Sequence, residues 1–192
     1  MEVKEKVMYL GDVLNTRGNN NDLIEDRVKK GKEVIVKAMS ICDISLGCHT
    51  IEILMLLYQS LFLSVVLYNC QSWTKLNIND LHRLTTIQIK YLKRSLQVPR
   101  STGDAVCFME LGIIPITFEI DIRRLIFLQH IIQMENDDPV KLVYKQQRQY
   151  PNEENWNNEM KQKLLLYNII YTEEDIEGMS KYKWKKRGKR KS

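Results

Sequence analysis

The stretch from Ile51 to Trp73, IEILMLLYQSLFLSVVLYNCQSW, is the most apolar segment of the chain and constrains its fold most strongly. Its polar residues are few and too scattered to form a solvated face: Glu52, Gln59, Ser60 and Ser64. A helix that is apolar nearly all round is buried on every side, in a protein core or in lipid. We therefore expect this segment to be the central helix of a small helical domain.

The alternative for this segment is a membrane-spanning helix. Its continuous apolar part, residues 51–68, is at the short limit for crossing a bilayer, and its flanks lack charged and aromatic anchors. The start of the chain, MEVKEKVMYLG, has no apolar signal-peptide core. We expect no membrane association, an intracellular location (cytoplasmic or nuclear) and free thiols at all four cysteines.

Apolar residues at helical spacing predict a mainly α fold in this 192-residue chain. The expected architecture is a bundle of about six to seven helices, one short N-terminal β-strand or hairpin and a disordered basic tail. Residues 1–20 hold the strand and a turn, and residues 21–150 the helical bundle. Residues 151–180 form an accessory acidic helical segment after a polar break, and residues 181–192 are the tail.

The strand is expected at Val7–Leu14, which is rich in Val and Tyr. The first helix follows over residues 24–42, with Asp22 as its cap and an apolar residue every three or four positions. Its opposite face is basic and carries Arg27, Lys29, Lys30, Lys32 and Lys37.

A second basic helix is expected over residues 81–96. Residues 77–80 offer its cap, and Pro99 ends it because the residue before a proline is pushed out of the α region. Basic residues follow one another at spacings that align several of them along one face. These candidates for phosphate contact are Arg83, Lys90, Lys93, Arg94 and Arg100. The alternative is an ordinary solvated helix face.

Further helices are expected before Gly112, over residues 118–134, after Asp138-Pro139 and from Trp156 onward. Between residues 135 and 180 ten acidic residues outnumber five basic ones, so phosphate binding is not expected there.

The tail carries eight basic residues and no acidic one: Lys181, Lys183, Lys185, Lys186, Arg187, Lys189, Arg190 and Lys191. Without them the chain has 21 basic against 24 acidic residues, so its basic character comes mainly from the tail. The tail can serve as a nucleic-acid arm or a nuclear-import signal, or only as a solubilising end.

The sequence indicates no catalytic residue, metal site or cofactor site. The spacings of Cys42, Cys48-His49, Cys70 and His82 match no compact zinc site. No hydrolase signature or glycine-rich phosphate loop occurs. The acidic pair Asp137-Asp138 is more simply a helix cap before proline.

Several short motifs follow in a set order: Tyr9-Leu10-Gly11, Gln71-Ser72-Trp73, Val98-Pro99-Arg100-Ser101-Thr102, Glu110-Leu111-Gly112-Ile113 with Pro115, and Arg123-Arg124 with His130 and Met134. Their order and spacing, over about residues 7 to 170, resemble the segment after the polymerase core in reverse transcriptases of non-LTR (LINE-type) retrotransposons. The resemblance implies the thumb and the region after it.

The tyrosine-x-aspartate-aspartate strand with which that family holds two metal ions does not occur in this chain. The resemblance therefore implies a truncated RNA-directed DNA polymerase fragment without fingers or palm and without catalytic activity. Its expected partners are an RNA or DNA template–primer duplex, bound weakly and without sequence preference, and a palm domain missing from the chain.

The alternative hypothesis is a helical scaffold or protein-interaction domain, or an unselected open reading frame, with no nucleic-acid role. In that case we expect the apolar N-terminal residues Val7, Met8, Leu10 and Val13 to be exposed and to promote self-association.

Overall fold

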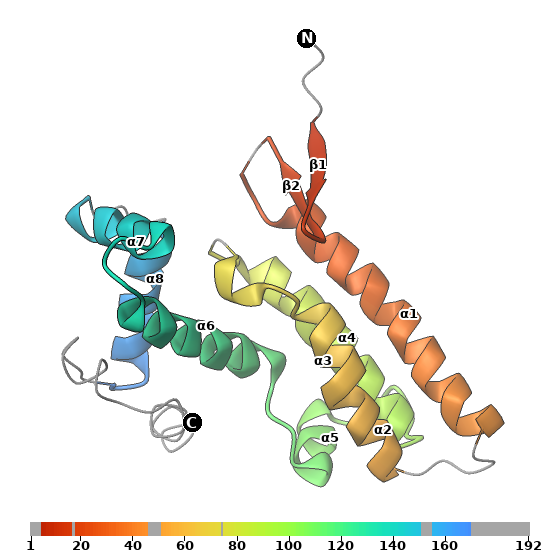
Figure 1. Ribbon diagram of the computed structural model, residues 1–192. Coiled ribbons are helices and arrows are strands. Elements are labelled where there is room, and N and C mark those ends of the chain that lie inside the picture. The colour runs from red at the N-terminus through yellow and green to blue at the C-terminus, as the bar shows by residue number, and fades with distance from the viewer. Residues whose placement is uncertain (1–4, 17, 46–50, 74, 151–154, 170–192) are drawn as a thin grey trace. The chain divides into compact units, whose positions relative to one another are not determined.

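The computed structural model describes residues 5–16, 18–45, 51–73, 75–150 and 155–169 (Figure 1). These residues are mainly helical and begin with a two-stranded antiparallel hairpin, as predicted. The elements are β1 (Lys6–Tyr9), β2 (Asp12–Asn15), α1 (Asn21–Ser45), α2 (Ile51–Leu57), η1 (Tyr58–Phe62), α3 (Leu63–Val66), η2 (Cys70–Ser72), α4 (Ile78–Ser95), α5 (Asp104–Leu111), α6 (Ile116–Gln133), α7 (Pro139–Gln149) and α8 (Trp156–Leu166). Because α2, the π-helical η1 and α3 follow without a break, we call them together the central helix.

The described chain forms two compact units. The first contains residues up to 69 and residues 76–117, and the second contains residues 70–75 and those from 118 onward. The sequence pattern instead placed a boundary at residues 150–155. The structure keeps α7 and α8 in one unit because Tyr144 and Met160 belong to the same apolar core. The predicted basic tail, residues 181–192, lies outside the described residues.

The core of the first unit forms where α1, the central helix and α4 meet. A Cβ atom at Gly31 would lie 2.9 Å from Val66 Cγ2 and 3.3 Å from Ile87 Cγ1, so a side chain there would have to push the neighbouring helices apart. The rings of Tyr58, Phe62 and Tyr91 pack beside this point, with centroids 5.0 to 5.4 Å apart.

The central helix is not buried on every side, which corrects the sequence interpretation. Leu54 and Phe62 are fully buried, but Leu56 is 63% exposed and several polar residues lie in solvent with it. These residues are Glu52, Gln59, Ser60 and Ser64. They recur about once per helical turn and so share one face. The two serine hydroxyls donate to carbonyls four residues earlier in the same helix, at 2.7 Å each.

The apolar run 7–14 is a hairpin and not one continuous strand. Leu10 and Gly11 both have positive φ values (46° and 86°), which is the backbone of a type I′ turn. The turn pairs Val7 with Leu14 and Met8 with Val13. Val7, Met8 and Leu10 are exposed, as predicted, whereas Val13 is half-buried.

Arg27 lies on the basic face of the predicted helix, yet it is only 3% exposed and joins the hairpin to α1. Its Nη2 donates to the Gly11 carbonyl oxygen at 2.8 Å and forms an ion pair with Asp12. Its guanidinium also lies over the Tyr68 ring, 5.0 Å from the centroid. Asn69 Nδ2 donates to the other Asp12 carboxylate oxygen at 2.6 Å. Each member of the buried Arg27–Asp12 ion pair therefore has a further hydrogen-bond partner.

The second unit is organised around the buried Arg124 of α6. Its Nη1 and Nη2 donate to the two carboxylate oxygens of Glu159 on α8, at 2.6 and 2.8 Å. Nη2 also donates to the Trp73 carbonyl oxygen at 2.9 Å. Nearby, Asp121 accepts from Lys163 Nζ at 3.0 Å and from the Tyr167 hydroxyl at 2.6 Å. Asp121 therefore connects α6 to α8, in addition to lying near the start of α6.

Helix α4 ends before Pro99, at a turn that the sequence did not indicate. Gln97 adopts a left-handed conformation with φ of 54°. Its N–H donates to the Arg94 carbonyl at 3.1 Å, and the Val98 N–H donates to the Lys93 carbonyl at 3.1 Å. This is a Schellman motif, in which glycine is the usual left-handed residue. Gly112 has that conformation after α5, where the predicted stop is confirmed.

The substitution Gln97→Gly is expected to raise the free energy of unfolding by about 1 kcal/mol, because a left-handed conformation strains a residue with a Cβ atom. Urea unfolding measures the change. Glu33→Gly, at an exposed site inside α1, is the control and should lower stability by about 1 kcal/mol. A loss of stability on Gln97→Gly would contradict the strain.

The substitution Glu159→Gln is expected to lower the free energy of unfolding by about 3 kcal/mol, because Arg124 then remains buried without a counterion. The double substitution Arg124→Met/Glu159→Met removes both charges and should cost less than Glu159→Gln alone. Equal losses in urea unfolding would show that the uncompensated charge is not the cause.

Candidate nucleic-acid interface

Helix α4 carries the predicted basic face, and its start has the predicted cap. The Asn77 side chain accepts from the Asp80 N–H at 2.9 Å, and the Asp80 carboxylate accepts from the Asn77 N–H at 3.3 Å. This capping box starts the helix at Ile78, earlier than the predicted residue 81. On the opposite face α4 buries Leu84, Ile87, Tyr91 and Leu92, which follow the spacing of one helix face.

Gln88 fixes the position of α4 within the first unit. It is fully buried, and its Nε2 donates to the Tyr58 hydroxyl at 2.7 Å and to the Ile114 carbonyl at 2.9 Å. Its Oε1 accepts from the Ile116 N–H at 2.8 Å. The buried face of α4 is thereby fixed to the central helix and to the start of α6, and this orients the opposite face outward.

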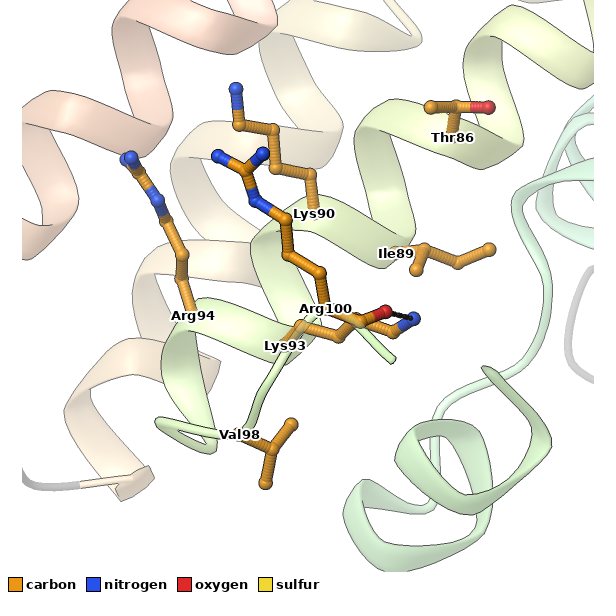
Figure 2. Close-up of a pocket in the computed structure, with 7 residues that line it drawn as sticks. All are labelled: Thr86, Ile89, Lys90, Lys93, Arg94, Val98 and Arg100. Atoms are coloured by element: carbon orange, nitrogen blue, oxygen red, sulfur yellow. Dashed lines mark hydrogen bonds between the residues drawn. The ribbon is translucent and has the colours of Figure 1, made fainter. Parts of the chain in front are cut away.

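A pocket of about 360 Å³ lies along the outer face of α4 and the turn that follows it. Figure 2 shows the residues that line it, which are Thr86, Ile89, Lys90, Lys93, Arg94, Val98 and Arg100. Four of the five predicted phosphate-contact residues therefore come together here. Arg83 is half-buried and is not among the lining residues, so its role remains a prediction.

Lys93 differs from the other basic residues of the pocket because its charge is compensated. Its Nζ forms an ion pair with Asp104 at 2.7 Å and donates to the Arg100 carbonyl oxygen at 2.9 Å. Its side chain is only 14% exposed. Lys93 therefore holds the turn after α4 against α5, and is a weaker candidate for phosphate contact than its neighbours.

Lys90, Arg94 and Arg100 are exposed. In the part of the chain that the structure describes, none of them forms an ion pair with a carboxylate. Figure 2 shows their charged ends turned to the same side, away from Val98. Three positive charges that have no carboxylate partner among the described residues therefore border one pocket, and they form the candidate ligand site.

The other predicted positions have structural roles or lie outside the description. The Asp138 side chain caps α7 by accepting from the Val140 N–H at 2.8 Å, as predicted. Cys42 and Cys70 are both fully buried within the core. Burial raises the pKa of the Cys70 thiol to about 11, which disfavours the thiolate that a metal ligand needs.

The described residues contain no group of three or more His, Cys, Asp or Glu residues able to hold a metal ion. Within the same residues, no helix is long and apolar enough to cross a bilayer.

The apolar lining residues Ile89 and Val98 were not predicted as part of the site. A signal for Ile89 was present, because residues 86, 89, 90, 93 and 94 follow the three- and four-residue spacing of one helix face. Val98 and Arg100 join that face only through the left-handed turn at Gln97, which lacks the glycine that would have marked it.

A scan of protein-family models and searches of curated proteins and of solved structures found no match to this chain. The resemblance to LINE-type reverse transcriptases therefore rests on the sequence motifs described above.

Proposed function

We propose that this chain is a non-catalytic, thumb-like segment of a non-LTR reverse transcriptase that binds duplex nucleic acid weakly and without sequence preference. The observation that carries the proposal is the grouping of Lys90, Arg94 and Arg100 on the outer face of α4, without carboxylate partners in the described residues. Cations in this arrangement favour an anionic ligand that extends past them, and the phosphates of a nucleic-acid backbone form such a ligand.

The first unit supports the proposal because its α4 is rigidly held. The capping box at Asn77 and the buried Gln88 fix the start and the inner face of α4, so its basic face needs no folding step before it meets a ligand. The Lys93–Asp104 pair holds Arg100 close to the helix. Contacts from a rigid face to phosphates position a protein on a duplex without reading its sequence.

The order of motifs along the chain supports the family part of the proposal, since a thumb in that family lays a helix along the template–primer backbone. The chain itself has no tyrosine-x-aspartate-aspartate sequence.

Binding to a labelled blunt duplex is expected to weaken roughly 40-fold when salt rises from about 50 to about 200 mM, the dependence given by about three phosphate contacts. Fluorescence anisotropy over a salt series measures this slope. The triple variant Lys90→Glu/Arg94→Glu/Arg100→Glu should bind too weakly for a salt dependence to be measured.

The matched control is Lys29→Glu/Lys32→Glu/Lys37→Glu, which makes the same charge change at exposed positions of α1 in the same unit. It should keep most of the affinity. Equal losses in the two variants would mean that binding follows net charge and not the α4 face. An affinity that does not change with salt would contradict phosphate binding altogether.

A second function, a helical protein-interaction domain, is favoured by one observation. The hairpin exposes a group of apolar side chains, namely Val7, Met8, Tyr9, Leu10 and Leu14. An exposed apolar group of this kind often marks a protein interface or promotes self-association.

If the hairpin is an interface, self-association covers its exposed apolar side chains. Size-exclusion chromatography should then show self-association that rises with protein concentration, by mass action. The variant Met8→Lys/Leu10→Lys should elute as a monomer, whereas Leu165→Lys, at an exposed residue of α8, should elute like the parent. A parent chain that is monomeric at every concentration would count against this function.

A further inference from the structure

The pocket beside α4 differs from a simple phosphate site, because apart from the exposed charged ends of Lys90, Arg94 and Arg100 its wall has little unused hydrogen-bonding capacity. The Thr86 hydroxyl donates to the His82 carbonyl of its own helix at 2.8 Å. The Lys93 ammonium is bound to Asp104 and to the Arg100 carbonyl. The remaining wall is formed by Ile89, Val98 and the aliphatic stems of the long basic side chains.

A phosphate group would be poorly placed deep in such a pocket, because it would give up water without gaining donors on most sides. A nucleobase is better suited, since its two faces are apolar and polarisable. Ile89, Val98 and the aliphatic stems of Arg94 and Arg100 offer apolar contact to those faces. The volume of about 360 Å³ lies within the range of pockets that hold small organic ligands.

We propose that this pocket takes an unpaired nucleobase at a single-stranded end, while Lys90, Arg94 and Arg100 hold the phosphates beside it. The inference rests on the proposed function and adds a specificity to it. Bases inside a duplex are stacked on both faces and cannot enter a pocket. The site therefore distinguishes a duplex with an overhang from a blunt duplex, without reading its sequence.

The test compares three labelled duplexes with the same paired region, by anisotropy on the full chain at one low salt concentration. One duplex is blunt, one has a short single-stranded overhang, and one has the same overhang built of abasic nucleotides. The overhang with bases should bind about tenfold more tightly than the other two, since base stacking and not extra phosphate supplies the gain.

The variant Ile89→Gln makes the pocket wall polar without changing charge and should reduce the advantage of the base-containing overhang at least several-fold. Leu56→Gln, at an exposed apolar position of α2, is the matched control and should keep the full advantage. Thermal unfolding of both variants checks that they remain folded. If Ile89→Gln does not fold, the comparison of the base-containing and abasic overhangs on the parent chain still tests the proposal.

Equal binding of blunt and base-containing overhang duplexes would overturn the inference and leave the proposed function standing. Equal binding of the abasic and base-containing overhangs would also overturn it, because phosphate would then account for the gain. Failure to bind any of the three duplexes would overturn the proposed function itself, and the inference with it.

Discussion

The first unit depends on the close approach of three helices at Gly31. A Cβ atom there would lie 2.9 Å from Val66 Cγ2, so the absence of a side chain lets α1 contact α3 and α4 at one point. The packing around this point fixes the aromatic rings of Tyr58, Phe62 and Tyr91. Since close-packed interiors transmit displacement, a shift at this contact would move α4, and the basic face of α4 is the candidate site.

Buried ion pairs have a comparable role in the positions of the remaining elements. Arg27 and Asp12 hold the hairpin on α1, and Arg124 and Glu159 hold α6 to α8. Arg27 lies close to several lysines in the sequence and Arg124 follows Arg123, and a solvated position is the ordinary expectation for an arginine. Their burial depends on acidic partners 15 and 35 residues away in the chain. No local pattern reports such a partner, because the pairing arises only when the helices pack.

Part of the candidate site could be predicted from the sequence, and part depends on the tertiary structure. The spacing of Lys90 and Arg94 placed them on one outward face before the structure was known, and the structure keeps them there. The return of Arg100 to that face depends on Gln97 in a left-handed conformation, for which a glutamine gives no signal. The different role of Lys93 depends on Asp104, which follows the turn and comes near only because the chain reverses.

From the sequence alone, helical periodicity, caps and breakers determined the mainly α fold, the N-terminal β element, the cap of α4 and the stop at Gly112. These features follow from interactions within a few residues, which sequence spacing records directly. The tertiary structure alone decided which face of the central helix is covered, where the two units divide and which basic residues keep an uncompensated charge. Each of these depends on contacts between residues far apart in the chain. The local spacing of residues does not show which distant residues will meet.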